Sequence, residues 1–150
     1  MTVIRPADPG EAEALSALAL RSKGYWGYDD DFLAACAAEL TVSPAQIGTE
    51  LVAVCVDDGA LVGFYVVAGE PPRAELAALF VEPEAIGRGY GRLLWHHAIA
   101  TARAAGFESV GLDADPGAAP FYAAMGAERI GWSPSGSVPG RHLPRFERRL

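Results

Sequence analysis

A glycine-rich stretch between an apolar strand and an amphipathic helix constrains this chain most. Residues 79–81 are apolar, and Glu82 and Pro83 follow them. Three glycines stand at alternate positions further on, namely Gly87, Gly89 and Gly91. Glycines let the backbone approach an anion and turn its N–H groups toward it. The positive end of the next helix points at the same place, and Arg88 and Arg92 add cations. The stretch therefore predicts a cradle for a phosphate group.

Two other interpretations of these glycines stay open. One is a structural turn that holds no ligand. The other is a dinucleotide-binding loop, which has the pattern G-x-G-x-x-G after the first strand of its unit. Here the spacing is G-x-G-x-G after the fourth expected strand. Asp113 is the only acidic residue placed to contact a ribose, and it fits a second motif better.

The second motif covers residues 113–127, which form a strand end, a turn and a short helix stopped by Gly126. The two stretches together resemble the GNAT superfamily of acetyl-CoA-dependent N-acyltransferases. Residues 79–95 look like its acyl-CoA pyrophosphate loop, and residues 118–126 look like its A-x-x-F-Y-x-x-x-G segment. The resemblance is strong over residues 74–132 and weaker before residue 50.

The resemblance implies acetyl-CoA as co-substrate, with the cofactor arm added along the strand before the glycines like an extra strand. A backbone amide of that strand would also stabilise the oxyanion. The implied cofactor-binding residues are Leu79, Phe80, Val81, Ile86, Gly87, Arg88, Gly89, Tyr90, Gly91, Arg92, Asp113, Ala118 and Phe121. The chain departs from the family at Ile86, where Gln or Arg is common. We expect this difference to weaken cofactor binding rather than abolish it, because the loop acts mainly through backbone amides.

Tyr122 and Glu75 are the expected catalytic residues. A tyrosine at the position of Tyr122 lies near the cofactor sulfur in the family and acts as a general acid. The alternative is a tyrosine that only packs against the cofactor or the core.

Glu75 begins the strand before the glycines. If Leu76 and Phe80 share one face of this strand, Glu75 lies on the other face. Its alternative is a solvated charge; Asp113 and Asp115 are second choices as bases, or caps of the short helix.

The acceptor side is expected in two loops. Tyr25, Trp26 and Tyr28 lie between the first two helices, where aromatic rings could bind an amine or simply pack on the core. Residues 133–145 lie between the last two strands, and Arg141 there could meet an acceptor carboxylate. The sequence does not identify the acceptor, which could be a small molecule or a peptide. Ala77 and Ala78 also leave room for a longer acyl group.

Composition limits the partners. The chain of 150 residues is long enough for one domain with its own core, spanning residues 1–150. Its net charge is −7, with the acidic excess in residues 1–75. We therefore expect no nucleic-acid partner, and the acidity favours a cationic substrate or serves solubility alone.

Because the N-terminus has no signal-peptide pattern and no apolar run is long enough for a membrane span, we expect a cytoplasmic protein. A homodimer is common among family relatives.

No metal site is expected. Cys36 and Cys55 stand in apolar surroundings without metal or redox spacing, which predicts buried free thiols. His96 and His97 are adjacent on a helix and point in different directions, and His142 has no evident partner.

The pattern predicts an α/β fold with a mixed, mostly antiparallel sheet of about six to seven strands and about four helices on both faces. The GNAT fold has the same order of strands and helices along the chain. The expected strands are residues 2–5, 51–56, 61–67, 74–81, 109–113, 127–132 and 143–149. The expected helices are residues 8–24, 29–40, 91–105 and 118–125. Residues 41–49 and 133–140 are expected loops, and Asp57-Asp58-Gly59 marks a hairpin turn.

The main prediction is direct acetyl transfer to a primary amine in a ternary complex, without a covalent acyl-enzyme. Two alternatives from other classes stay open. One is an acyl-CoA-binding or sensor domain that has lost turnover. The other is an interaction protein that has kept only the fold.

Overall fold

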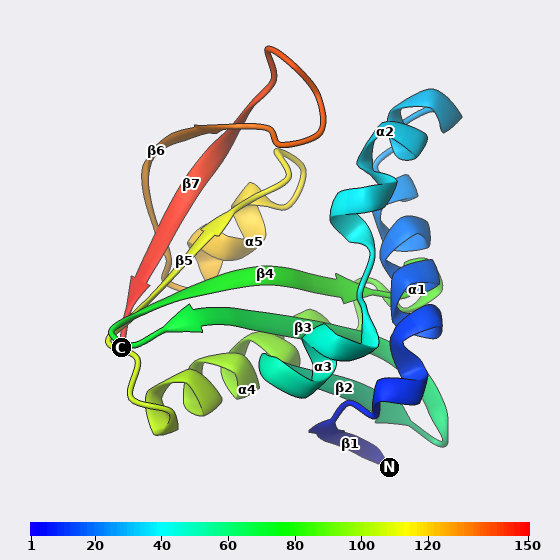
Figure 1. Ribbon diagram of the computed structural model, residues 1–150, viewed down its shortest axis with the longest axis vertical. Coiled ribbons are helices and arrows are strands. Elements are labelled where there is room, and N and C mark those ends of the chain that lie inside the picture. Colours follow the sequence, from blue (N-terminus) through cyan, green and yellow to red (C-terminus); the bar gives the residue numbers. More distant parts are fainter.

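The computed structural model describes residues 1–150, which form a central seven-stranded sheet with helices on both faces (Figure 1). The strands are β1 (Thr2–Pro6), β2 (Leu51–Asp57), β3 (Ala60–Glu70), β4 (Arg73–Val81), β5 (Ser109–Asp113), β6 (Glu128–Pro134) and β7 (His142–Arg149). The helices are α1 (Ala12–Gly24), α2 (Asp30–Leu40), α3 (Pro44–Thr49), α4 (Tyr90–Ala104) and α5 (Ala119–Ala124). Two short 3₁₀ turns, Pro9–Glu11 and Pro83–Ala85, precede α1 and α4.

The sheet order is β1-β2-β3-β4-β5-β7-β6, and only the β4–β5 pair is parallel. The predicted mixed, mostly antiparallel sheet is therefore confirmed. The β2–β3 hairpin turns through Asp58 and Gly59, whose φ angles are 48° and 82°. Both values lie in the left-handed region, as the predicted Asp-Gly turn requires.

Local sequence explains where the first helices begin. Asp8 accepts a hydrogen bond from the Gly10 amide, and Glu11 accepts one from the Asp8 amide, which makes a reciprocal cap. Asp29 accepts a hydrogen bond from the Phe32 amide and caps α2 without a reciprocal bond. The first cap belongs to the 3₁₀ turn that directly precedes α1, and the second begins α2; both helices border the main cavity.

The prediction of a loop over residues 41–49 is wrong in part, because residues 44–49 form helix α3. The structure gives a short helix from Pro44, capped by Ser43, which accepts a hydrogen bond from the Gln46 amide. A serine followed by proline is an ordinary start for a helix. Ile47 is buried and gives this helix its one anchor in the core. Pro44 and Gly48 therefore stand inside a helix of six residues.

Two apolar clusters lie on opposite faces of the sheet. One joins α4 and α5 to the sheet through Leu94, Trp95 and Tyr122. The other joins α1 and α3 to the sheet through residues such as Leu15 and Ile47. Cys36 and Cys55 are buried and free, as predicted. No helix combines the length and the apolar character that crossing a bilayer needs.

Candidate active site

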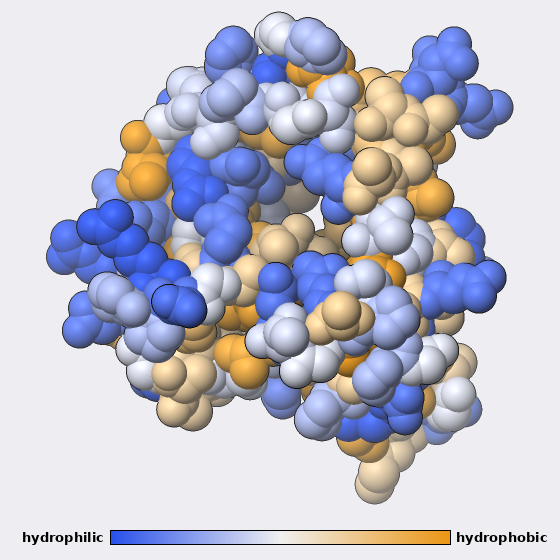
Figure 2. All heavy atoms as spheres, in the orientation of Figure 1, coloured by the Kyte–Doolittle hydropathy of each residue, from blue (hydrophilic) through white to orange (hydrophobic).

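Strands β4 and β5 separate in the middle of the sheet, and the separation forms the site. Their parallel pairing covers only residues 73–75 of β4 and 109–111 of β5, and ends at the Glu75–Gly111 pair. Beyond that pair the strands diverge, which Figure 1 shows as a fork that opens away from the C-terminus. A cavity of about 730 Å³ lies in and beside this fork. Figure 2 shows an opening at the centre of this face, with hydrophilic residues around much of its rim.

A bulge in β4 decides which of its side chains face the cavity. Val66 pairs with Ala78 but Val67 pairs with Leu76, so Ala77 has no partner on β3. The extra residue reverses the alternation of side chains along the strand. Leu76 packs in the cluster on the sheet face that α4 covers, whereas Phe80 packs against the cluster on the face that α1 covers. The expectation that Leu76 and Phe80 share a face is therefore wrong, since it assumed an unbroken strand.

The second half of β4 has one free edge. Residues 78–81 pair with β3 on one side, and no β5 pairing faces them on the other. All of residues 75–81 line the cavity. The backbone edge of Leu79, Phe80 and Val81 is therefore available for pairing with an extended ligand.

The glycine loop closes one end of the cavity. Gly87 and Gly89 have φ angles of 88° and 90°, which favour glycine strongly. Gly89 is also the residue that precedes α4, and no side chain caps this helix. The first-turn N–H groups of α4 thus have no side-chain acceptor within the protein, which suits an anion. We call this region, residues 86–92 with α5, the glycine end.

The structure divides the predicted residues of this loop into two groups. Ile86, Gly87, Gly89, Gly91 and Arg92 line the main cavity. Arg88 and Tyr90 do not; they line a separate hollow of about 420 Å³ beside Asp57. The Tyr90 hydroxyl donates a hydrogen bond to the Asp57 carboxylate, which lowers the pKa of that carboxyl group.

Helix α5 places an isolated hydroxyl in the cavity. Ala118, Phe121 and Tyr122 all line it, and Gly91 of α4 lies beside the Phe121 ring, which a Cβ at residue 91 would meet at 3.4 Å, an ordinary contact distance. Tyr122 is only 8% exposed, and its ring packs edge-on against Trp95. Its hydroxyl forms no hydrogen bond within the protein, and burial raises its pKa well above the ordinary tyrosine value. Tyr122 therefore carries its proton throughout the neutral range.

Glu75 and Asp113 both line the cavity at the fork, and both contact Arg145 of β7. The guanidinium donates to both oxygens of Glu75, at 2.7 and 2.8 Å. Glu75 is therefore neither a free base nor an isolated solvated charge. Sequence reasoning missed Arg145, because nothing local to residue 145 shows that β7 lies across the sheet from Glu75.

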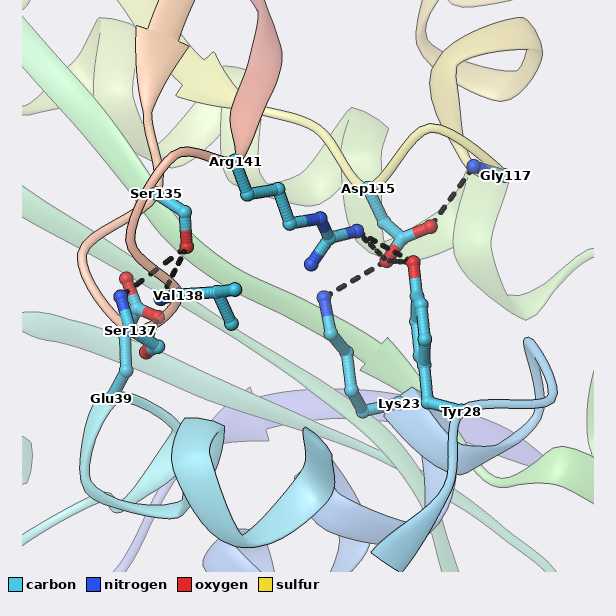
Figure 3. Close-up of polar contacts among 9 residues, drawn as sticks. All are labelled: Lys23, Tyr28, Glu39, Asp115, Gly117, Ser135, Ser137, Val138 and Arg141. Carbon is cyan, nitrogen blue, oxygen red and sulfur yellow. Dashed lines mark hydrogen bonds and ion pairs between the residues drawn. The ribbon is translucent and has the colours of Figure 1, made fainter. Parts of the chain in front are cut away.

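Asp115 lies in the cavity wall just before α5 and joins three segments of the chain (Figure 3). Its carboxylate accepts hydrogen bonds from Lys23 Nζ at 2.9 Å, from the Tyr28 hydroxyl at 2.8 Å and from the Gly117 amide at 2.9 Å. Arg141 lies 3.7 Å away and donates to the Tyr28 hydroxyl at 2.6 Å. Burial opposes ionisation of Asp115, but these donors outweigh it and lower its pKa. Lys23 was not among the predicted residues, because a lysine in the last turn of a helix is ordinary.

The predicted aromatic residues of the α1–α2 loop have different places. Trp26 lines the cavity and packs over Gly117, where a Cβ would lie 2.6 Å from the indole. Tyr28 stacks on Phe32 behind the cavity, with a ring-centroid distance of 4.0 Å. Tyr25 is 50% exposed and touches the edge of Trp26. Only Trp26 forms part of the wall.

One carboxylate of the wall has no cationic partner. Glu39 lies at the end of α2 and accepts a hydrogen bond from the Ser137 hydroxyl in the β6–β7 loop. The loop thus reaches from β7 across to α2, and Figure 3 shows Ser135, Ser137 and Glu39 together at this crossing. Gln46 and Thr41 line the cavity nearby. We call this region, with Lys23, Trp26 and Asp115, the loop end.

The model of the acetyltransferase (GNAT) family matches residues 18–127. The chain belongs to this family. The family and the fold that the sequence predicted are both confirmed. No curated protein matches the chain in sequence.

Solved structures show the same fold over the whole chain. A GCN5-related N-acetyltransferase from Rhodopseudomonas palustris has a TM-score of 0.83 at 24% identity, covering 100% of this chain and 96% of its own. The PaiA N-acetyltransferase from Thermoplasma acidophilum, solved with coenzyme A, has a TM-score of 0.83 at 20% identity, covering 100% and 99%. YncA, a putative acetyltransferase from Salmonella typhimurium solved with acetyl-CoA, has a TM-score of 0.71 at 20% identity, covering 100% and 94%. At these identities the likeness establishes the fold alone.

Proposed function

We propose that residues 1–150 act as one N-acetyltransferase domain that transfers the acetyl group of acetyl-CoA to a primary amine. One observation carries the proposal. The free edge of β4, the glycine loop at the start of α4 and the isolated hydroxyl of Tyr122 line a single cavity. Membership of the GNAT acetyltransferase family supports acetyl transfer in general.

The glycine end fits the donor. The backbone amides of Gly87, Gly89 and Gly91, together with Arg92, would hold the pyrophosphate. The free edge of residues 79–81 would bind the pantetheine amides as a strand binds its neighbour, and one of its N–H groups would stabilise the oxyanion. Structural neighbours solved with coenzyme A and with acetyl-CoA support the same donor.

Tyr122 would supply the proton for the leaving group. The acceptor first loses one proton to water, which converts the ammonium ion to the neutral amine. The neutral nitrogen then forms a bond to the thioester carbonyl carbon, and the carbon–sulfur bond breaks. The departing sulfur takes the phenol proton, which is available because burial keeps Tyr122 protonated. The proton that the nitrogen loses after attack passes to water, and water returns a proton to the Tyr122 phenolate. Glu75 is not assigned as the base, because Arg145 donates to both of its oxygens. Glu75 remains in the proposal as an anionic contact at the fork.

The loop end would receive the acceptor. Its wall combines apolar groups such as Val42 with Glu39, whose carboxylate has no cationic partner. An anion at the entrance favours an acceptor that arrives as an ammonium ion. Arg141 would act indirectly, because it braces Tyr28 and does not line the cavity.

Titration calorimetry with acetyl-CoA tests the donor, with coenzyme A as competitor. We expect stoichiometric binding, followed by thiol release when primary amines are added. Binding without thiol release from any amine would favour a sensor domain instead. Absence of binding at millimolar acetyl-CoA would contradict both functions.

A further inference from the structure

A three-residue ion cluster lies at the point where β4 and β5 separate. Glu75 and Gly111 form the last parallel pair of the two strands. Arg145 of β7 stands opposite Asp113 of β5 in the β5–β7 register. Its Nη1 and Nη2 atoms donate to the two Glu75 oxygens, and Nη1 also lies 3.2 Å from Asp113 Oδ1. One guanidinium therefore connects both branches of the fork.

The absence of a side chain at residue 111 makes this bridge possible. A Cβ on Gly111 would lie 2.4 Å from Nη2 of Arg145 and 3.1 Å from its Cζ. The guanidinium thus lies directly over the β5 backbone, next to the last strand pair. The φ angle of Gly111 is not in the left-handed region, so space rather than backbone conformation requires glycine here.

Nothing else joins the two strands on this face beyond the last pair. Helices α4 and α5 pack against the other face, through Val110 and Leu112 of β5. Without the guanidinium, the Glu75 and Asp113 carboxylates would face each other across the fork as like charges. A single exposed ion pair contributes little to stability, but this one is bidentate and shared by two strands. Its effect should therefore fall on the geometry of the fork more than on the free energy of folding.

We propose that Arg145 is a positioning residue that holds β4 and β5 at the separation in which the acyl-CoA arm binds between them. This inference rests on the proposed function, because it needs a ligand in the fork. Arg145 does not line the cavity, and it acts through the two strands that do. The free edge of residues 79–81 can pair with the pantetheine arm only if β4 keeps this distance.

Arg145→Met tests the proposal through acetyl-CoA affinity and steady-state kinetics. We expect the dissociation constant for acetyl-CoA to rise about tenfold and kcat/KM to fall by up to about a hundredfold, since small displacements cost that much. Arg145→Lys should give intermediate values, because one ammonium keeps the charge but cannot bridge bidentately. Arg103→Met is the matched control, since Arg103 is exposed on α4 and forms no ion pair.

Gly111→Ala provides a second variant that keeps all three charges. The new methyl group should displace the guanidinium and weaken acetyl-CoA binding as Arg145→Met does, while Gly48→Ala, where nothing lies within 4 Å, should not. Lower melting temperatures with unchanged acetyl-CoA affinity and KM would show a merely structural residue and overturn the inference. If the unaltered protein binds no acetyl-CoA, the proposed function fails as well; if it binds and the variants bind equally, only this inference fails.

Discussion

The two ends of the cavity are held together by different kinds of interaction. At the glycine end, backbone conformation and apolar packing do the work, with left-handed Gly87 and Gly89 and a tyrosine buried without a hydrogen bond. At the loop end, charged side chains from distant segments meet, with Asp115 accepting from Lys23 and Tyr28. The glycine end thus depends on backbone conformation and packing, whereas the loop end depends on the ionised form of Asp115, which is lost in acid.

The largest effect should come from removing the hydroxyl at the glycine end. Tyr122→Phe should lower kcat by about 10²- to 10⁴-fold, the usual contribution of a positioned proton donor. Acetyl-CoA affinity and the melting temperature should hardly change, because the hydroxyl forms no hydrogen bond in the protein. In the unaltered enzyme, kcat should show no loss from Tyr122 ionisation between about pH 7 and 10, since its pKa is raised above the ordinary value.

Tyr65→Phe is the matched control for that variant. Tyr65 is also buried, but its hydroxyl contacts His97 at 2.8 Å and Thr101 at 3.1 Å and lies outside the cavity. The Tyr65→Phe variant should be less stable than the unaltered enzyme and should keep the same kcat. Equal turnover in Tyr122→Phe and the unaltered enzyme would remove the acid role.

The loop end should respond to Asp115→Asn in stability. Asp115 and Lys23 are 10% and 13% exposed, so we expect the free energy of unfolding to fall by about 2 kcal/mol at neutral pH. The folded-state pKa of Asp115 is lowered, so its stabilisation is present above about pH 5 and is lost as pH falls through that pKa. Denaturant titrations should therefore show the two proteins converging in acid.

The KM for the amine should also rise in Asp115→Asn, while acetyl-CoA affinity stays the same. Asp58→Asn is the control, because Asp58 pairs with the N-terminus but is 86% exposed. A large change in acetyl-CoA affinity would show that the two ends are not separable in this way.

This contrast also explains how far the sequence alone reached. The glycine end was predictable because its geometry requires particular residues at fixed spacing, such as Gly89 before α4 and Tyr122 on α5. The loop end was predictable only in part: its two loops and Trp26 were expected there, but the meeting of Asp115, Lys23 and Arg141 depends on the tertiary fold. The bulge at Ala77 and the bridge from Arg145 to Glu75 likewise depend on strand pairing, which composition and alternation do not reveal.

A backbone substitution tests the glycine end directly. Gly89→Ala forces a side chain into a φ of 90°, and we expect acetyl-CoA affinity to fall about tenfold. Gly59→Ala imposes the same strain at a φ of 82° in the β2–β3 turn, and neither new Cβ meets an atom within 4 Å. Both variants should lose similar stability, measured by thermal melting, but only Gly89→Ala should lose affinity in calorimetry. Parallel losses of affinity would mean that strain alone, and not the cradle, explains the result.

The smallest effect concerns the one position where the loop departs from its family. Ile86 lines the cavity but offers no charge or hydrogen bond to a phosphate. Ile86→Arg should raise acetyl-CoA affinity about three- to tenfold at low salt, because a guanidinium pairs well with phosphate in a partly exposed site. The gain should shrink as salt rises, whereas Ile86→Met, which keeps the apolar volume, should show no gain at any salt concentration. Unchanged affinity in Ile86→Arg would mean that backbone amides and Arg92 already satisfy the pyrophosphate, which would extend the backbone-built character of the glycine end to its whole surface.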